Sequence, residues 1–200
     1  MKTRLTAALA LVMLALLAPG PALAFDAEQT FAKGGFVLSG EGAYGWQLDI
    51  EDNRDFSAIE FWDAGIRFGV LPFDTLGKGS PLYGAFEIGL EPLYQRYVEP
   101  QRRFWAGLSA VVRYHFLALG RVVPYVELAG SAGGTDLNLP EIRSNFAFLL
   151  FGGVGASVFL TDRTAVYAGY RYEHVSNGNT SRPNRGFESN VAVVGLSLFF

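Results

Sequence analysis

Three residues near the end of the chain carry the side chains that an ester hydrolase needs. His174 and Ser176 end one apolar, alternating segment, and Glu188 begins the next, which finishes on Phe200. A hydroxyl, an imidazole and a carboxylate can serve as nucleophile, general base and the group that orients the base. If the two segments are neighbouring antiparallel strands, the loop 178–187 brings Glu188 beside the other two. The pattern therefore predicts a serine esterase site at one hairpin.

The spacing of these residues suits the roles they would take. Residues two apart on a strand point to the same face, so the His174 imidazole can reach the Ser176 hydroxyl without crossing the sheet. His174 would take the proton of Ser176, and Glu188 would hold the imidazole tautomer and stabilise its charged form. Three groups in or beside the loop are candidate donors to a developing oxyanion: Asn177, Asn184 and the backbone amide at Gly186. On spacing alone, an interfacial histidine, a Ser-Asn-Gly turn and a rim glutamate remain the alternative.

The beginning of the chain has the pattern of a secretory signal peptide. Lys2 and Arg4 precede the apolar stretch 5–17, and Ala22-Leu23-Ala24 offers a small-x-small cleavage site. The stretch is too short for a membrane-spanning helix, which needs about 20 apolar residues. We expect three parts: a cleaved signal peptide at 1–24, a periplasmic N-terminal segment at 25–34 and one domain at 35–200.

Composition narrows the class of protein. Removing residues 1–24 from the 200 leaves 176, and the loss of Lys2 and Arg4 from 16 basic residues leaves 14 against 19 acidic, a formal charge of −5. Such a charge argues against nucleic acid as a partner. The chain has no cysteine, so backbone pairing and packing must hold the fold.

No cofactor is predicted. The two histidines, His115 and His174, fall on opposite predicted strand faces, and thiol ligands are absent, so no metal site is expected. A phosphate-binding loop of the form GxxxxGK followed by Ser or Thr is also absent.

After the leader, hydrophobic residues recur with a period of two, which is typical of strands. Eight such segments follow one another: 36–46, 58–70, 82–94, 104–116, 122–130, 146–160, 166–176 and 188–200. Their even-numbered sides are mostly apolar, with tyrosine, tryptophan and phenylalanine near the ends as interfacial girdles require. The chain stops on Phe199-Phe200, which resembles the C-terminal signature of bacterial outer-membrane barrels. We therefore predict an all-β fold, an eight-stranded antiparallel transmembrane β-barrel.

This topology decides where the polar residues point. The charged odd-numbered sides, including His115, would fill the narrow interior as a plug of paired ions. With both termini in the periplasm, the links at 49–57, 96–102, 132–143 and 176–187 face outward. His174, Ser176 and Glu188 are even-numbered, which places them on the lipid-facing side at the extracellular end. A catalytic site reached from the outer leaflet would explain polar residues there.

The same hairpin resembles a known family. Tyr170-Arg171-Tyr172-Glu173-His174-Val175-Ser176-Asn177 and Pro183-Asn184-Arg185-Gly186-Phe187-Glu188-Ser189 are similar to the active-site hairpin of the PagL family, outer-membrane lipid A 3-O-deacylases. The resemblance covers about 170–189, with a weaker echo at 124–130. Arg185 departs from the small or acidic residue expected there, which leaves the triad untouched but the loop conformation and regiospecificity open.

The resemblance implies a function and a place for it. An eight-stranded barrel would carry the triad on its outer surface and remove the ester-linked acyl chain at the 3-position of lipid A. His174 would be the base, Ser176 the nucleophile, Glu188 the orienter and Asn184 an oxyanion-hole candidate. The partners are lipid A, or lipopolysaccharide, and the outer-membrane lipid, with Arg182 and Arg185 able to attract anionic headgroups.

Two other functions stay open on the sequence. One is a non-enzymatic structural or adhesion barrel, and the other is a lipid-modifying barrel of different regiochemistry, such as an acyltransferase or phospholipase. The apolar exterior is compatible with a monomer and with a homodimer, because contact with lipid requires an apolar surface whether or not a second copy binds.

Overall fold

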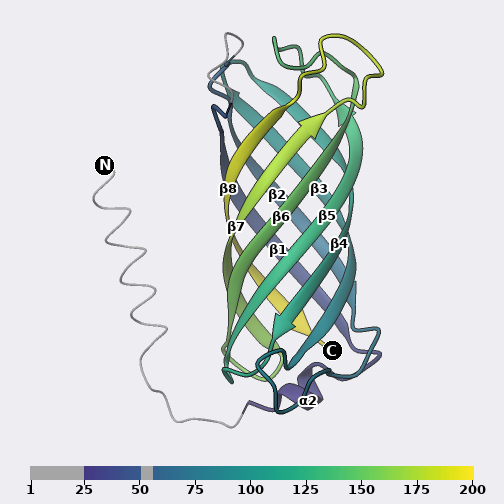
Figure 1. The fold of residues 1–200 in the computed structure, drawn as a ribbon, viewed down its shortest axis with the longest axis vertical. Coiled ribbons are helices and arrows are strands. Elements are labelled where there is room, and N and C mark those ends of the chain that lie inside the picture. Colours follow the sequence, from purple (N-terminus) through teal and green to yellow (C-terminus); the bar gives the residue numbers. More distant parts are fainter. Residues whose placement is uncertain (1–24, 51–55) are drawn as a thin grey trace, which may run out of the picture.

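The computed structural model describes residues 25–50 and 56–200 and is a closed barrel of eight antiparallel strands (Figure 1). The strands are β1 (Phe36–Gln47), β2 (Glu60–Val70), β3 (Gly84–Glu99), β4 (Arg103–Phe116), β5 (Val122–Thr135), β6 (Phe146–Phe159), β7 (Thr164–Ser176) and β8 (Phe187–Phe199). Each strand pairs with its neighbours in sequence, and β1 pairs with β8, so no strand edge is left unpaired. The predicted fold class is confirmed. The predicted signal peptide lies outside the described residues.

β3 and β5 extend well beyond the segments that the sequence pattern indicates. β3 continues past Tyr94 to Glu99, and β5 continues past Gly130 to Thr135. The second extension is rich in glycine, which has low strand propensity, but it pairs with both β4 and β6. At Gly133 an added Cβ would lie 2.4 Å from the Ala106 carbonyl oxygen, so the close approach of the two strands requires glycine. The link predicted near 96–102 is present but shorter, at 100–102, because pairing with β2 and β4 extends β3.

The polarity of the barrel is the reverse of that of a water-soluble protein. Large apolar side chains cover the outside, where Phe68 is 60% exposed and Leu128 is 69% exposed. Charged side chains such as Glu91 and Arg113 are buried in the lumen. This arrangement is typical of a transmembrane barrel. Among the described residues, no helix has the length and hydropathy to cross a bilayer.

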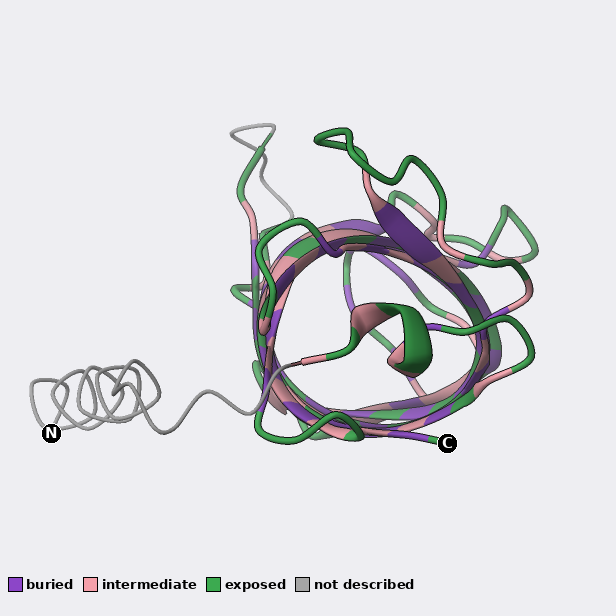
Figure 2. Ribbon diagram, turned by 90° about the horizontal axis from the view of Figure 1, so that it is seen from below, coloured by how far each residue is buried: buried purple, intermediate pink, exposed green. Residues whose placement is uncertain are grey.

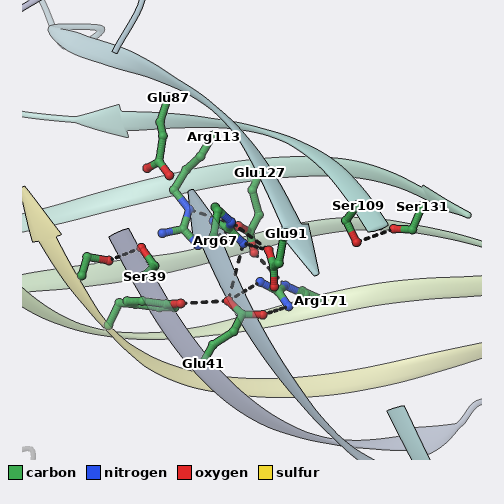
Figure 3. Close-up of polar contacts among 12 residues, drawn as sticks. Ser39, Glu41, Arg67, Glu87, Glu91, Ser109, Arg113, Glu127, Ser131 and Arg171 are labelled. Atoms are coloured by element: carbon green, nitrogen blue, oxygen red, sulfur yellow. Dashed lines mark hydrogen bonds and ion pairs between the residues drawn. The ribbon is translucent and has the colours of Figure 1, made fainter. Parts of the chain in front are cut away.

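Ion pairs fill the middle of the lumen (Figure 3). Arg171 donates to Glu127 at 2.8 Å and to Glu41 at 2.9 Å. Arg113 donates to the same Glu127 at 2.8 Å, and Arg67 donates to Glu91 at 2.8 Å. Buried charges are tolerated when they are paired in this way. The predicted plug of paired ions is confirmed.

The short helix α2 (Ala27–Thr30) lies across one mouth of the barrel, at the end where the chain finishes (Figure 2). Phe31, which follows α2, is fully buried, and its ring lies 4.9 Å from the His115 ring. His115 Nε2 lies 2.9 Å from Glu87 Oε2. His115 is therefore part of the packing under α2. We call this end of the barrel the α2 end and the opposite end the loop end.

Candidate active site

The register of β7 and β8 places His174 directly opposite Glu188, at the loop end of the barrel. His174 Nδ1 lies 2.9 Å from Glu188 Oε1. The two side chains are 35% and 29% exposed and stand on the outer face, among the apolar residues of neighbouring strands. Directly opposite residues on one face of an antiparallel pair are close enough to interact. The hairpin therefore brings together the predicted base and its orienting carboxylate.

Ser176 is the last residue of β7 and lies on the same face as His174. It is partly exposed and stands opposite Phe148 of β6. Because Glu188 occupies Nδ1 of the imidazole, Nε2 is the nitrogen left to act on a hydroxyl. Within the described residues, no hydrogen bond joins the Ser176 hydroxyl to His174, and in serine hydrolases this contact often tightens only around substrate.

Gly186, at the end of the loop between β7 and β8, lies close to His174 and Ser176. Its φ of +75° is in the left-handed region. An added Cβ would lie 2.6 Å from the Val175 carbonyl oxygen, 3.0 Å from His174 Cε1 and 3.3 Å from Ser176 Cβ. Only glycine fits both the conformation and the space. The backbone at this position is therefore a wall of the site.

The three candidate oxyanion donors differ in what they already bind. The Asn177 side chain is buried and donates to the Ser181 carbonyl at 3.0 Å and its hydroxyl at 2.9 Å. The Gly186 amide donates to the Glu141 carbonyl at 3.0 Å. Asn184 accepts from the Asn177 amide at 2.7 Å and donates to Asn179 at 3.1 Å. An amide nitrogen carries two hydrogens, so Asn184 keeps one for a ligand.

A second loop, residues 136–145 between β5 and β6, is tied to the 177–186 loop. The Arg185 amide donates to the Glu141 carbonyl at 2.9 Å, and the Arg143 amide donates to the Pro183 carbonyl at 3.1 Å. Sequence reasoning did not identify Glu141 or Arg143, because a polar loop residue carries no motif that names its partner.

An apolar groove of about 530 Å³ lies across the outside of β4, β5, β6 and β7, with His174 in its lining. Gly130 and Gly152 form its floor, and Leu128 and Leu150 stand beside them. A Cβ on Gly130 would lie 3.5 Å from Leu150 Cδ2, and one on Gly152 would lie 3.3 Å from Leu128 Cδ2. The missing side chains thus leave a depression in an otherwise bulky apolar surface.

A polar cleft of about 840 Å³ lies at the loop end over the same strands. Arg103 and Arg143 contribute positive charge to it, Asp136 contributes negative charge, and Ser181 belongs to the 177–186 loop. Phe146, also in its lining, is two residues from Phe148, which faces Ser176. The site therefore lies between a polar cleft and an apolar groove. In the described part of the chain, no three His, Cys, Asp or Glu side chains are grouped to hold a metal ion.

Comparison with known proteins gives the family. The family model described as lipid A 3-O-deacylase (PagL) matches residues 45–197. The crystal structure of the outer membrane enzyme PagL is similar at 17% identity and a TM-score of 0.57, over 80% of this chain and 97% of that one. Neisserial surface protein A is similar at 18% identity and a TM-score of 0.57, over 83% of this chain and 99% of that one.

At these identities the structural likeness shows the fold alone. Among curated proteins, none matches this chain. The family model covers well over half of the chain and includes β7, the loop that follows it and β8 as far as Ser197. The chain therefore belongs to the PagL family.

Proposed function

We propose that this protein is a serine esterase that hydrolyses the 3-O-linked acyl chain of lipid A. The observation that carries the proposal is the hydrogen-bonded pair of His174 and Glu188 on the apolar outer face, with Ser176 two residues along the same strand. The barrel would sit in the outer membrane, with the loop end outward and the α2 end in the periplasm. The site would then face the outer leaflet, where its substrate lies.

The chemistry follows from these positions. Ser176 Oγ attacks the ester carbonyl carbon as its proton passes to His174 Nε2, and Glu188 stabilises the imidazolium. Asn184 donates to the oxyanion. When the intermediate collapses, the bond between the acyl carbon and the ester oxygen breaks, and that oxygen, which stays on the sugar, takes the proton from His174 and becomes a hydroxyl. Water then hydrolyses the acyl-serine and releases a 3-hydroxy fatty acid. No cofactor is required.

The apolar groove and the polar cleft suit the acyl chain and the phosphorylated sugar of such a substrate. The acyl chain would lie in the groove over Gly130 and Gly152, whose lining includes His174. The phosphorylated sugar would lie toward the polar cleft, where Arg103 and Arg143 offer charge-assisted hydrogen bonds to phosphate. Arg182, in the same loop as the site, could add to this attraction.

The decisive experiment compares lipid A from cells that produce the wild type, Ser176→Ala or Ser189→Ala. Ser189 is a matched control, because it lies on the same hairpin but is buried on the lumen side. We expect mass spectrometry to show loss of one 3-hydroxyacyl group with the wild type and Ser189→Ala, and none with Ser176→Ala. Heat-modifiable migration on gels confirms that each barrel is folded.

Undiminished release by Ser176→Ala would refute the assignment of the nucleophile. The same spectra separate the other functions. A gain of acyl mass would indicate an acyltransferase, loss from phospholipids would indicate a phospholipase, and an unchanged lipid profile would indicate a non-enzymatic barrel.

A further inference from the structure

Glu141 is a fully buried carboxylate at the loop end of the barrel, outside the residues that the proposed chemistry uses. Its Oε1 accepts from Gln47 Nε2 at 3.0 Å and from the Ser57 amide at 2.8 Å. Its Oε2 accepts from the Ser57 hydroxyl at 2.7 Å. Gln47 ends β1 and Ser57 precedes β2, so the carboxylate binds loop 136–145 to the region between those strands.

The backbone of the same residue binds the loop that carries the site. The Glu141 carbonyl accepts from the amides of Arg185 and Gly186 at 2.9 Å and 3.0 Å. The Arg185 guanidinium also lies 3.9 Å from Glu141 Oε1. Glu141 thus joins three loop regions that are far apart in the sequence. The pairing also gives a structural reason for arginine at 185, the position that departs from the family's hairpin pattern.

Gly186, which Glu141 holds in place, lies against the two groups that would react, the His174 imidazole and the Ser176 hydroxyl. Its backbone lies so close to His174 Cε1 and Ser176 Cβ that no side chain fits between them. A shift of Gly186 must therefore change the space in which the imidazole and the hydroxyl meet. Misplacement of reacting groups by about 1 Å can cost roughly 100-fold in rate.

We propose that Glu141 is a positioning residue for the esterase site, which holds Gly186 against His174 and Ser176. The carboxylate fixes Glu141 to Gln47 and Ser57, and the backbone carbonyl of Glu141 fixes the 177–186 loop. This proposal rests on the proposed function, because it assumes that the site hydrolyses an ester. The contacts that carry it concern the reactivity of Ser176 and do not depend on which lipid is the substrate.

The test uses the full-length barrel in lipid vesicles that contain lipid A. Glu141→Ala leaves Gln47 Nε2 and the Ser57 amide without their acceptor, and we expect kcat to fall about 10- to 100-fold with KM little changed. Glu141→Gln should restore most of kcat, because its carboxamide oxygen can take both bonds at Oε1 and its NH₂ can donate to the Ser57 hydroxyl. Ser57→Ala removes one of the three bonds and should lower kcat less.

Glu87→Ala is the matched control, because it removes a buried, hydrogen-bonded carboxylate at the α2 end. It should lower barrel stability without lowering kcat of the folded protein. The proposal is overturned if folded Glu141→Ala keeps its kcat, if only KM changes, or if Glu141→Gln falls as far as Glu141→Ala.

A second readout separates this proposal from the substrate. An alkyl fluorophosphonate forms an Oγ–P bond with an activated serine, expels fluoride from phosphorus and leaves the hydroxyl proton on the histidine. We expect Glu141→Ala to slow the labelling of Ser176 about as much as it lowers kcat. If the wild type is labelled but does not hydrolyse lipid A, only the proposed substrate is overturned. A wild type that is neither labelled nor active would overturn both proposals.

Discussion

His174 and Glu188 lie opposite each other across β7 and β8, with Nδ1 2.9 Å from Oε1 on the outer face of the barrel. A carboxylate on Nδ1 keeps the proton on that nitrogen and leaves Nε2 as the acceptor. The pairing follows from strand register and does not depend on a flexible loop. It is therefore present before any substrate arrives.

This relationship predicts the effect of Glu188→Gln. A carboxamide can pair with either imidazole tautomer and does not stabilise the imidazolium, so we expect kcat for release of the 3-hydroxy fatty acid to fall about 10³-fold. Glu60→Gln is the control, since Glu60 also stands at the loop end of the barrel, where it accepts from Tyr44. Full activity of Glu188→Gln would show that the carboxylate does not orient the base.

Gly186→Ala should lower activity as well as stability. The left-handed φ costs an alanine about 1–2 kcal/mol, and the new Cβ must also displace the Val175 carbonyl or the His174 ring. Gly120→Ala has the same kind of φ, +64°, but nothing lies within 4 Å of its Cβ. Unfolding in urea should show the cost of the left-handed φ in both variants and a further loss in Gly186→Ala, and only Gly186→Ala should lose esterase activity. Equal activity of the two would contradict a tight wall at Gly186.

Gly130→Leu tests the acyl groove. A leucine on this floor fills the depression between Leu128 and Leu150, so longer acyl chains should lose access and KM for lipid A should rise. Labelling of Ser176 by a short fluorophosphonate should stay unchanged. Gly40→Leu makes the same change on the outer face of β1, where nothing lies within 4 Å of the added Cβ. If both variants keep the chain-length preference of the wild type, the acyl chain lies elsewhere.

Arg171→Met tests the role of the lumen charges. The change leaves Glu41 and Glu127 with fewer partners inside the barrel, and loss of one member of a buried ion pair costs about 3–5 kcal/mol. We expect a lower urea midpoint with nearly unchanged kcat of the folded protein, because the pair lies in the lumen and the site lies outside. Lys78→Met removes an exposed ion pair with Glu28 and should leave the midpoint where it was. A stable Arg171→Met barrel would show that the network adds little to stability.

Much of the fold is readable from residue parity. Glu127 and Leu128 are neighbours in the chain, yet one is buried in the lumen and the other is 69% exposed on the outside. Because side chains alternate along a strand, the even-numbered positions of His174, Ser176 and Glu188 already predict one shared outer face. The residue types then predict the kind of reaction.

Other features depend on the folded chain. The extension of β5 to Thr135 contains glycines, whose low strand propensity argues against a strand there. It forms because β4 and β6 pair with it. The anchorage of Gly186 by Glu141 joins residues 45 positions apart and continues to Gln47 and Ser57.

The sequence by itself therefore determined the strand faces and the barrel, since these follow from a local, periodic pattern, and its residue types predicted the candidate esterase residues. Only the tertiary structure decided the register that pairs His174 with Glu188 and the loop contacts that surround Ser176. Hydrogen bonds between distant segments leave no pattern in either segment, because a carbonyl or a carboxylate can accept from any donor that the fold brings to it.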